Sequence, residues 1–527
     1  MQQQSTRASS TAAPRTGGAL RAWRWLVAAA ALAAIAAGVL QLERDRSDLV
    51  VDTRQVGSQP VTVYRPATAR EPAPVVLVAH GFAGSQQLMQ PIAITLARNG
   101  YAAITFDFPG HGRNADPMRG GLKDEQQSLQ TLIASMEEMR TLALELSGGR
   151  PYAVLGHSMA SDIVVRHAQA HPEVAATVAV SLFAPSITKD SPADSPRNLL
   201  VIDGAWEPEF MYTEALRVTA SATPGATHGD FAAGTARRAT LAPGVEHIGV
   251  LYSRHTLAES VAWLDQAFGR AGASAPHAVA SGPWLGLLFA GVVALAWPLS
   301  FLLPKVSPAS PVDPAPRRPW WRWRGQAPVV VVPALLTPLL LWKLPGEFLP
   351  ILLGDYLLLH FALYGLLTLA GLRLLREPLP RVAWPALAVA ALAASAYALL
   401  AMGLPLDRYI FNMQPVEPRL PLIAAMCAGT LPWFLADEWM SRAPRAAPGT
   451  YLASKCGFLI SLVLAIALNP ARLFFLAIIV PAILLLFLVY GLFSRWTFAR
   501  SAHPAVAAIA NALAFAWFVA VVFPLVG

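Results

Sequence analysis

The sequence predicts an α/β domain with a mostly parallel sheet, joined to an all-α polytopic membrane domain. Over residues 50–270, short β-rich runs alternate with helical stretches, which is typical of parallel strands joined by crossover helices. Over residues 284–527, eight long apolar runs predict about eight membrane helices. The composition agrees: 55% of the residues are hydrophobic and 14% are charged, against about 45–50% and about 25% in soluble domains.

The N-terminus predicts a disordered tail and a membrane anchor. Residues 1–20 are polar and small, with few groups that could form a core. Residues 22–42 are apolar and long enough to cross a bilayer. A cleaved signal peptide is the competing interpretation, because the run is rich in alanine. We favour an uncleaved anchor, since no Ala-x-Ala site precedes a polar start. Both interpretations place the following residues outside the cytoplasm.

The α/β domain is predicted to contain seven strands and four main helices, followed by a small-residue linker over residues 271–283. β-branched and apolar runs predict the strands: Val61–Tyr64, Val75–Ala79, Ala102–Phe106, Tyr152–Leu155, Ala176–Leu182, Leu199–Ile202 and Ala239–Ala242. Apolar spacing predicts the helices: Asp124–Leu146, Met159–His167, Glu209–Val218 and Leu257–Phe268.

The membrane domain is predicted from its apolar runs, whose ends are the least certain feature. They are Trp284–Leu303, Val329–Leu344, Phe348–Leu372, Ala383–Met402, Leu420–Ala436, Tyr451–Leu468, Leu473–Phe493 and Ala505–Leu525. Asp355 and His360 share one run, but five residues separate them, so they do not share a helix face. Polar contacts between helices are the favoured interpretation for this pair. Asp437, Glu438 and Lys455 lie near run ends, where we expect interfacial positions.

Basic residues alternate between the loops of the membrane domain and predict its orientation. The rich loops hold Lys305, Arg317, Arg318, Arg322 and Arg324; Arg373, Arg376 and Arg381; Arg442 and Arg445; Arg495 and Arg500. The poorer loops hold Lys343, Arg408, Arg419 and Arg472. The positive-inside rule then places the N-terminus in the cytoplasm and the α/β domain on the periplasmic side of a bacterial inner membrane. The rule also accounts for the net charge of +8. The α/β domain has no basic stripe with interleaved aromatic residues, so we predict that the chain does not bind nucleic acid.

One stretch, Tyr152–Ala160, points to chemistry. An apolar strand ends at Gly156, the chain turns through Ser158, and a helix follows. Such a strand-turn-helix exposes a serine hydroxyl beside a helix N-terminus, which suits a nucleophile. A helix N-cap is the competing role for Ser158.

Four further segments sharpen this interpretation, and with them the chain resembles the α/β-hydrolase superfamily of serine hydrolases over about residues 60–270. The segments, with the serine turn, are His80-Gly81-Phe82, Asp107 to Gly112, Gly156 to Ala160, Gly204 to Glu207 and Pro243 to His247. Candidate serine, acid and histidine follow one another in the order of that superfamily. Ala160 stands where the motif commonly has glycine, and it is small enough for the turn.

The resemblance implies roles for individual residues. Ser158 would be the nucleophile, and the amides of Phe82 and Met159 would form the oxyanion hole. His247 would be the base, with His255 as the alternative. Glu207 would be the acid, with Asp203 as the alternative because aspartate is the commoner acid.

No cofactor is predicted. Acyl transfer through serine needs no metal, and no His/Asp/Glu set with ligand spacing stands out in the α/β domain. Both cysteines, Cys427 and Cys456, lie in apolar runs, so neither a disulfide framework nor a cysteine metal site is expected.

The resulting prediction is a membrane-anchored, esterase- or lipase-like serine hydrolase that cleaves an ester or acyl bond. A lipid-borne ester is one candidate substrate, because the site is tethered close to a bilayer. Two alternatives stay open: an acyltransferase that passes the acyl group to a lipid or glycan, and a transporter or sensor whose hydrolase fold only binds.

Overall fold

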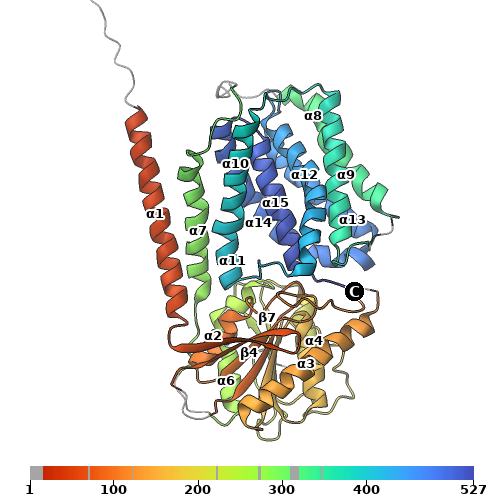
Figure 1. The fold of residues 1–527 in the computed structure, drawn as a ribbon. Helices are drawn as coiled ribbons and strands as arrows, with labels where there is room; N and C mark the ends of the chain where they lie inside the picture. Colours follow the sequence, from red (N-terminus) through yellow and green to blue (C-terminus); the bar gives the residue numbers. More distant parts are fainter. Residues whose placement is uncertain are drawn as a thin grey trace, which may run out of the picture.

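The structure is a computed structural model, and it describes residues 16–527 except 69–71, 122, 221–222, 271–274, 309–319, 345 and 347. Figure 1 shows a domain built on a β-sheet at one end of a bundle of long helices. Two predicted segments lie partly outside the described residues. These parts are residues 1–15 of the predicted tail over 1–20 and residues 271–274 of the predicted linker.

The sheet has eight strands in the order β1-β2-β4-β3-β5-β6-β7-β8. β1 pairs with β2 and β2 with β4 in antiparallel fashion, and the remaining pairs are parallel. The strands are β1 (Leu49–Val56), β2 (Gln59–Pro66), β3 (Val75–Ala79), β4 (Ala102–Phe106), β5 (Tyr152–His157), β6 (Val174–Val180), β7 (Leu199–Gly204) and β8 (Arg237–Ala242). All seven predicted strands are present, with ends shifted by a few residues. β1 was not predicted, because this edge strand carries Asp52 and Arg54 and is only half-buried.

Helices cover both faces of the sheet, as the buried strands require. β3 and β4 are buried at every position, and such continuous apolar runs form central parallel strands. One face packs against α2 (Gln90–Arg98) and α6 (Arg254–Ala267). The other face packs against α3 (Glu125–Ser147), α4 (Met159–Ala170) and α5 (Glu209–Thr219). This is the mostly parallel α/β arrangement that the sequence predicts.

Nine helices in the described part of the chain are long and apolar enough to cross a membrane, as in a multi-pass membrane protein. Eight of them correspond to the eight predicted apolar runs. The helices are α1 (Thr16–Arg44), α7 (Ser281–Ser300), α8 (Trp323–Leu341), α9 (Gly354–Leu374), α10 (Trp384–Ala396) continuing into α11 (Gly403–Tyr409), α12 (Leu420–Arg442), α13 (Thr450–Leu468), α14 (Pro470–Ser501) and α15 (Ala505–Val522). Figure 1 shows α1 and α7 side by side at one edge of the bundle.

Small residues let the membrane helices approach closely around an aromatic centre. A Cβ added to Gly365 of α9 would lie 2.3 Å from the backbone nitrogen of Trp433 in α12, so only glycine fits there. The buried rings of Trp433, Phe361 and Phe458 pack with centroids 4.5 to 5.4 Å apart. Since lipid removes the usual hydrophobic drive between helices, such close packing is what holds the bundle together.

Charged side chains that were expected at the interface are buried between helices instead. Asp437 and Glu438 of α12 are each 1% exposed, and Lys455 of α13 is 7% exposed. Lys455 donates to Asp437, and Ser454 donates to the same carboxylate at 2.6 Å. The expectation fails because neighbouring helices cover these positions, although each lies near the end of its own helix.

The carboxyl end of the sheet docks on the membrane domain through backbone and side-chain hydrogen bonds. In the loop after β4, the Gly110 carbonyl accepts from the Leu525 amide at 2.8 Å, and the Met118 amide donates to the Leu525 carbonyl at 2.9 Å. The buried Arg419 guanidinium donates to the Gly110 carbonyl at 2.7 Å. Arg113 forms an ion pair with Asp407 at 2.9 Å. This edge of the sheet, where α/β domains place their sites, therefore faces the membrane helices.

Candidate active site

Ser158 lies on the sharp turn between β5 and α4. Its backbone has φ of 54° and ψ of −118°, a region that side-chain-bearing residues rarely occupy and that costs free energy. The Ser158 amide donates to the Val180 carbonyl at 2.9 Å, which ties the turn to β6. A Cβ added to Gly156 would lie 2.4 Å from the Ala160 carbonyl, so glycine lets the strand pass beneath the helix. The turn therefore holds the hydroxyl out from the sheet edge.

His247 connects Ser158 to Glu207. The His247 Nε2 atom lies 2.9 Å from the Ser158 Oγ, and its Nδ1 lies 2.5 Å from the Glu207 Oε1. With Nδ1 donating to the carboxylate, Nε2 is left to accept the serine proton. The histidine comes from the turn after β8, and the acid comes from the turn after β7.

Glu207 is held by two further donors. Its Oε2 accepts from the Ser181 hydroxyl at 2.9 Å and from the Gly204 amide at 2.6 Å. The side chain is 2% exposed. Together with His247, these donors fix the carboxylate in one orientation and satisfy its charge.

The two alternative residues lie outside this chain of hydrogen bonds. His255, at the start of α6, has its Nε2 3.1 Å from the Thr240 hydroxyl. Asp203 accepts from the Leu182 amide at 3.1 Å through Oδ1. Burial and the neighbouring Glu207 carboxylate raise the pKa of Asp203 to about 7. The structure thus brings together Ser158, His247 and Glu207, and leaves His255 and Asp203 apart from them.

The loop after β3 lies against Ser158. His80 is buried, and its Nδ1 donates to the Gly81 carbonyl at 2.8 Å while its Nε2 accepts from the Phe108 amide at 3.1 Å. Burial lowers the pKa of His80, which keeps the ring neutral for this pair of contacts. A Cβ added to Gly81 would lie 2.9 Å from the Ser158 Cβ, so glycine permits the close approach. His80 thereby fixes the loop that carries Phe82.

The two predicted oxyanion donors flank the serine in sequence and space. Phe82 directly follows Gly81, and Met159 is the first residue of α4. Neither amide donates to another residue in the part of the chain that the structure describes. Free amides at a helix N-terminus and on an adjacent loop can stabilise a negative oxygen. Their role as an oxyanion hole stays a prediction.

His157 is a site residue that the sequence did not single out. Its Nε2 donates to the His247 carbonyl at 2.9 Å, and the two rings lie 4.9 Å apart. Burial and the neighbouring imidazole lower the pKa of His157 to about 3, so its ring is neutral. The available signal was its position, the variable residue of Gly-x-Ser, which the turn directs beside the serine.

The membrane domain contacts this loop directly. The Phe82 ring packs against Phe475 of α14 with centroids 4.8 Å apart. The Phe82 ring also meets the edge of the buried His111 ring at 6.3 Å. A residue whose amide is a candidate oxyanion donor is therefore positioned in part by a membrane helix.

The arrangement can carry out nucleophilic acyl chemistry with the residues present. A general base lies within hydrogen-bond reach of a hydroxyl, and a third group orients that base. A separate cluster of Glu137, His167 and His171, which the sequence did not predict, lies on α3 and α4.

Comparisons with known proteins agree with the fold. Residues 70–213 match a family model described as serine aminopeptidase, S33, which is an α/β-hydrolase family. This range contains Phe82, Ser158 and Glu207, whereas His247 lies beyond it. The match confirms the resemblance to α/β hydrolases. No curated protein sequence gives a significant match.

Several solved structures are similar to part of the chain. A predicted CIB-like hydrolase from Thermoplasma acidophilum is 16% identical, with 41% of this chain and 97% of that chain covered and a TM-score of 0.31. A membrane phospholipase A, titled a novel bacterial virulence factor, is 14% identical, with 48% and 95% covered and a TM-score of 0.31. A thioesterase domain from the curacin biosynthetic pathway is 13% identical, with 40% and 98% covered and a TM-score of 0.29.

Proposed function

We propose that this chain is a membrane-embedded serine hydrolase that cleaves an ester or acyl bond through an acyl-enzyme on Ser158. The observation that carries the proposal is the continuous hydrogen-bond chain from Ser158 through His247 to Glu207, at 2.9 and 2.5 Å. A helix-capping serine needs no such partners. The positive φ of Ser158, a strained conformation that the fold maintains, supports the same role.

The mechanism follows from the donors and acceptors in place. His247 Nε2 takes the Ser158 proton as Oγ bonds to the substrate carbonyl carbon, and the Glu207 carboxylate stabilises the imidazolium. The Phe82 and Met159 amides stabilise the oxyanion of the tetrahedral intermediate. When the intermediate collapses, His247 gives the proton to the leaving alcohol. Water then repeats the sequence on the acyl-enzyme, releasing the acid and free Ser158.

A lipid-borne substrate fits the placement of the site. The carboxyl edge of the sheet faces the membrane helices, and Phe475 of α14 reaches the Phe82 loop. This apolar contact beside the candidate oxyanion loop could receive an acyl chain.

We infer that the hydrolase domain lies on the periplasmic side of an inner membrane, with the N-terminus in the cytoplasm. Basic residues gather at the helix ends far from the sheet, and fewer lie near it, which supports this orientation through the positive-inside rule. The far set includes Lys305, Arg322, Arg373, Arg376, Arg442, Arg445 and Arg500; the near set includes Lys343, Arg408, Arg419 and Arg472.

The packing of α1 favours an uncleaved anchor. A Cβ added to Gly38 of α1 would lie 2.9 Å from the Leu288 Cβ of α7, and one added to Gly291 would lie 2.9 Å from the Ala31 carbonyl. Small residues on both helices thus permit close contact, which a cleaved leader would not need.

Labelling with a fluorophosphonate tests the nucleophile. The purified wild type should be modified, and the Ser158→Ala variant should not. Equal labelling of both proteins would refute the assignment. Ser161, in the first turn of α4, donates to the Ser158 carbonyl at 2.6 Å. Loss of labelling with Ser161→Ala would therefore point to collapse of the turn rather than loss of a nucleophile.

Substrate assays separate the remaining functions. p-Nitrophenyl esters of graded chain length should be hydrolysed, with preference for longer chains if the substrate is a lipid. Because the matching family is described as an aminopeptidase, aminoacyl anilides are the comparison for amide cleavage. Acyl transfer to an added alcohol in place of free acid release would favour the acyltransferase. Turnover of neither class by a protein that still binds acyl compounds would favour the transporter or sensor.

A further inference from the structure

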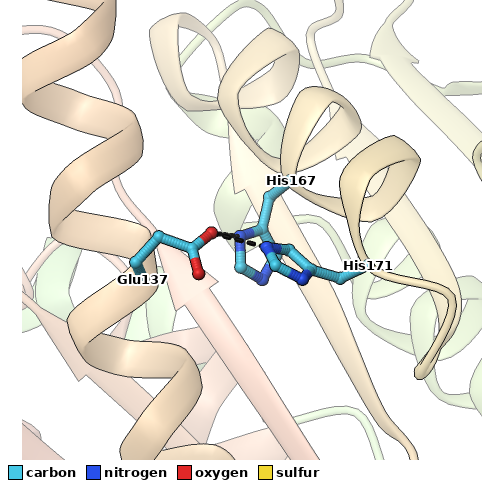
Figure 2. A group of neighbouring side chains, drawn as sticks. All are labelled: Glu137, His167 and His171. Atoms are coloured by element: carbon cyan, nitrogen blue, oxygen red, sulfur yellow. Dashed lines mark hydrogen bonds and ion pairs between the residues drawn. The ribbon is translucent and has the colours of Figure 1, made fainter.

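A cluster of two histidines and a glutamate lies on the outer face of the hydrolase domain, away from Ser158. Glu137 comes from α3, His167 from the last turn of α4, and His171 from the residue that ends α4 (Figure 2). The His171 Nε2 lies 2.6 Å from the Glu137 Oε1, and the His167 Nδ1 lies 3.3 Å from the same oxygen. One nitrogen of each ring therefore converges on one carboxylate oxygen.

Spacing along the helix explains the convergence. Residues four apart lie on one face of a helix, so His167 and His171 project together toward α3. All three candidate ligand atoms lie within 4.8 Å of one another. Ligand atoms about 2.0–2.1 Å from a tetrahedral zinc ion are about 3.3 Å apart. The His167 separation already has this value, and the His171 contact would lengthen by about 0.7 Å.

The other nitrogen of each ring faces an oxygen. The His167 Nε2 lies 2.7 Å from the Tyr152 hydroxyl, and the His171 Nδ1 lies 3.7 Å from the Glu173 Oε1. Arg140 holds Glu173 in turn at 2.6 Å. Metal-binding histidines are usually oriented by a hydrogen bond between an outer oxygen and the nitrogen that does not bind the metal. The Tyr152 contact is such a hydrogen bond, whereas Glu173 lies beyond hydrogen-bond distance of His171.

An ordinary ion-pair cluster accounts for only part of this arrangement. It explains the hydrogen bond between His171 and Glu137. It brings the buried His167 Nδ1 within 3.3 Å of the Glu137 carboxylate, but without the geometry of a hydrogen bond to any described residue, and burying a polar atom without a hydrogen bond is costly. A metal ion between the three side chains would satisfy that atom.

We propose that Glu137, His167 and His171 bind a divalent transition-metal ion, with Zn²⁺ as the preferred ion. Two imidazoles and a carboxylate suit zinc, whereas Mg²⁺ and Ca²⁺ prefer oxygen ligands alone. The fourth position would hold water, because Glu137 is 41% and His171 18% exposed. The ion would join α3 to α4 at the end of α4 opposite Ser158. Nine residues of helix, about 14 Å, separate it from the nucleophile, so the ion acts as a structural clamp.

Metal titration of the full-length protein tests the site. The protein is purified in detergent with a tag that contains no histidine, stripped with EDTA, and titrated with ZnCl₂ by calorimetry, with Tm measured in parallel. The wild type should bind one Zn²⁺ per chain and gain Tm, whereas MgCl₂ and CaCl₂ should give neither effect.

Variants locate the ion. Glu137→Gln keeps a hydrogen-bonding group beside His171 but removes a ligand, so Zn²⁺ affinity should fall by more than the roughly 10–100-fold typical of a lost outer partner. In Tyr152→Phe, which removes only an outer partner, Zn²⁺ affinity should fall by about 10–100-fold. His228→Ala, which removes an exposed histidine elsewhere, should bind as the wild type does.

Metal-free Tm values show whether each variant is folded before zinc is added. Zn²⁺ binding by Glu137→Gln with wild-type affinity would overturn the proposal. So would the absence of binding by the wild type, or loss of binding in His228→Ala alone.

Discussion

Replacing Glu207 with glutamine should leave the site assembled but hold His247 in the wrong tautomer. The Oε2 position faces two donors, the Ser181 hydroxyl and the Gly204 amide. A glutamine NH₂ placed there would face the Gly204 amide, which can only donate, and leave a buried group unsatisfied at a cost of about 1–3 kcal/mol, even if the Ser181 hydroxyl turned to accept. The NH₂ must therefore take the Oε1 position and donate to His247 Nδ1. The ring proton then moves to Nε2, which can no longer accept from Ser158.

The expected loss of kcat is large because His247 in the wrong tautomer cannot take the proton from Ser158. An amide that imposes the wrong tautomer in a serine triad lowers kcat by about 10⁴, which corresponds to about 5.4 kcal/mol of activation free energy. Hydrolysis of a p-nitrophenyl ester gives kcat and KM, and KM should change little. Glu209→Gln, an exposed neighbour at the start of α5, is the matched control.

Two results would refute this reasoning. One is a Glu207→Gln variant that keeps kcat within about tenfold of the wild type, since tenfold is only about 1.4 kcal/mol. The other is a variant of Asp203 that loses kcat by the full amount while the Glu207 variant does not. The first would remove Glu207 from the role of the acid, and the second would move that role to Asp203.

Three further changes test the surroundings of the site. Asp203 has a pKa of about 7 in the folded chain, against about 3.9 unfolded, so the contribution of this one group to stability is fully present at low pH and is lost as pH rises toward about 7, by about 4 kcal/mol. Asp203→Asn does not titrate, so its Tm advantage over the wild type should grow from about pH 5 to about pH 8; a constant difference would contradict this. Gly110→Ala places a Cβ 2.4 Å from the Leu525 carbonyl oxygen, at a φ of 79°. This variant should be less stable by about 2 kcal/mol or more, seen as a lower Tm. An unchanged Tm would show that the contact between the loop after β4 and Leu525 can shift without cost. Phe475→Ala removes the ring that packs on Phe82, so kcat/KM should fall about fivefold, the equivalent of about 1 kcal/mol for an aromatic pair; no change for any chain length would remove α14 from the site.

Local sequence patterns were sufficient to predict most of the sheet. Central parallel strands are buried on both faces, so β3, β4 and β5 appear in the sequence as uninterrupted apolar runs. The edge strand β1 escaped because half of its surface is exposed and its side chains include Asp52 and Arg54. Helix α2 escaped because Gln90 and Pro91 open it and it spans only Gln90–Arg98, too short for a clear period.

The candidate site divides in the same way. Ser158 could be predicted because the strand, turn and helix that expose it are consecutive in the chain. The order of the segments also predicted His247 and Glu207 as candidates, but only the folded chain separates them from His255 and Asp203. Their catalytic roles remain predictions.

Contacts between distant elements left no trace in the sequence. The cluster of Glu137, His167 and His171 depends on how α3 packs against α4, so the histidine spacing alone carried no decisive signal. The contact between Phe82 and Phe475 joins two domains, and no local pattern encodes it.

The pairing of Gly110 and Met118 with Leu525 has a consequence for biogenesis. The hydrolase domain is synthesised before the eight helices that follow it, yet the loop after β4 finds its partner only near residue 525. Contacts between residues so distant in sequence form late in folding. Until they form, the loop after β4 lacks its partner and can make incorrect contacts. Insertion of α15 must therefore precede closure of the junction. A chain stalled before that helix would carry the three candidate catalytic residues, but the loop after β4 would lack its hydrogen bonds to Leu525.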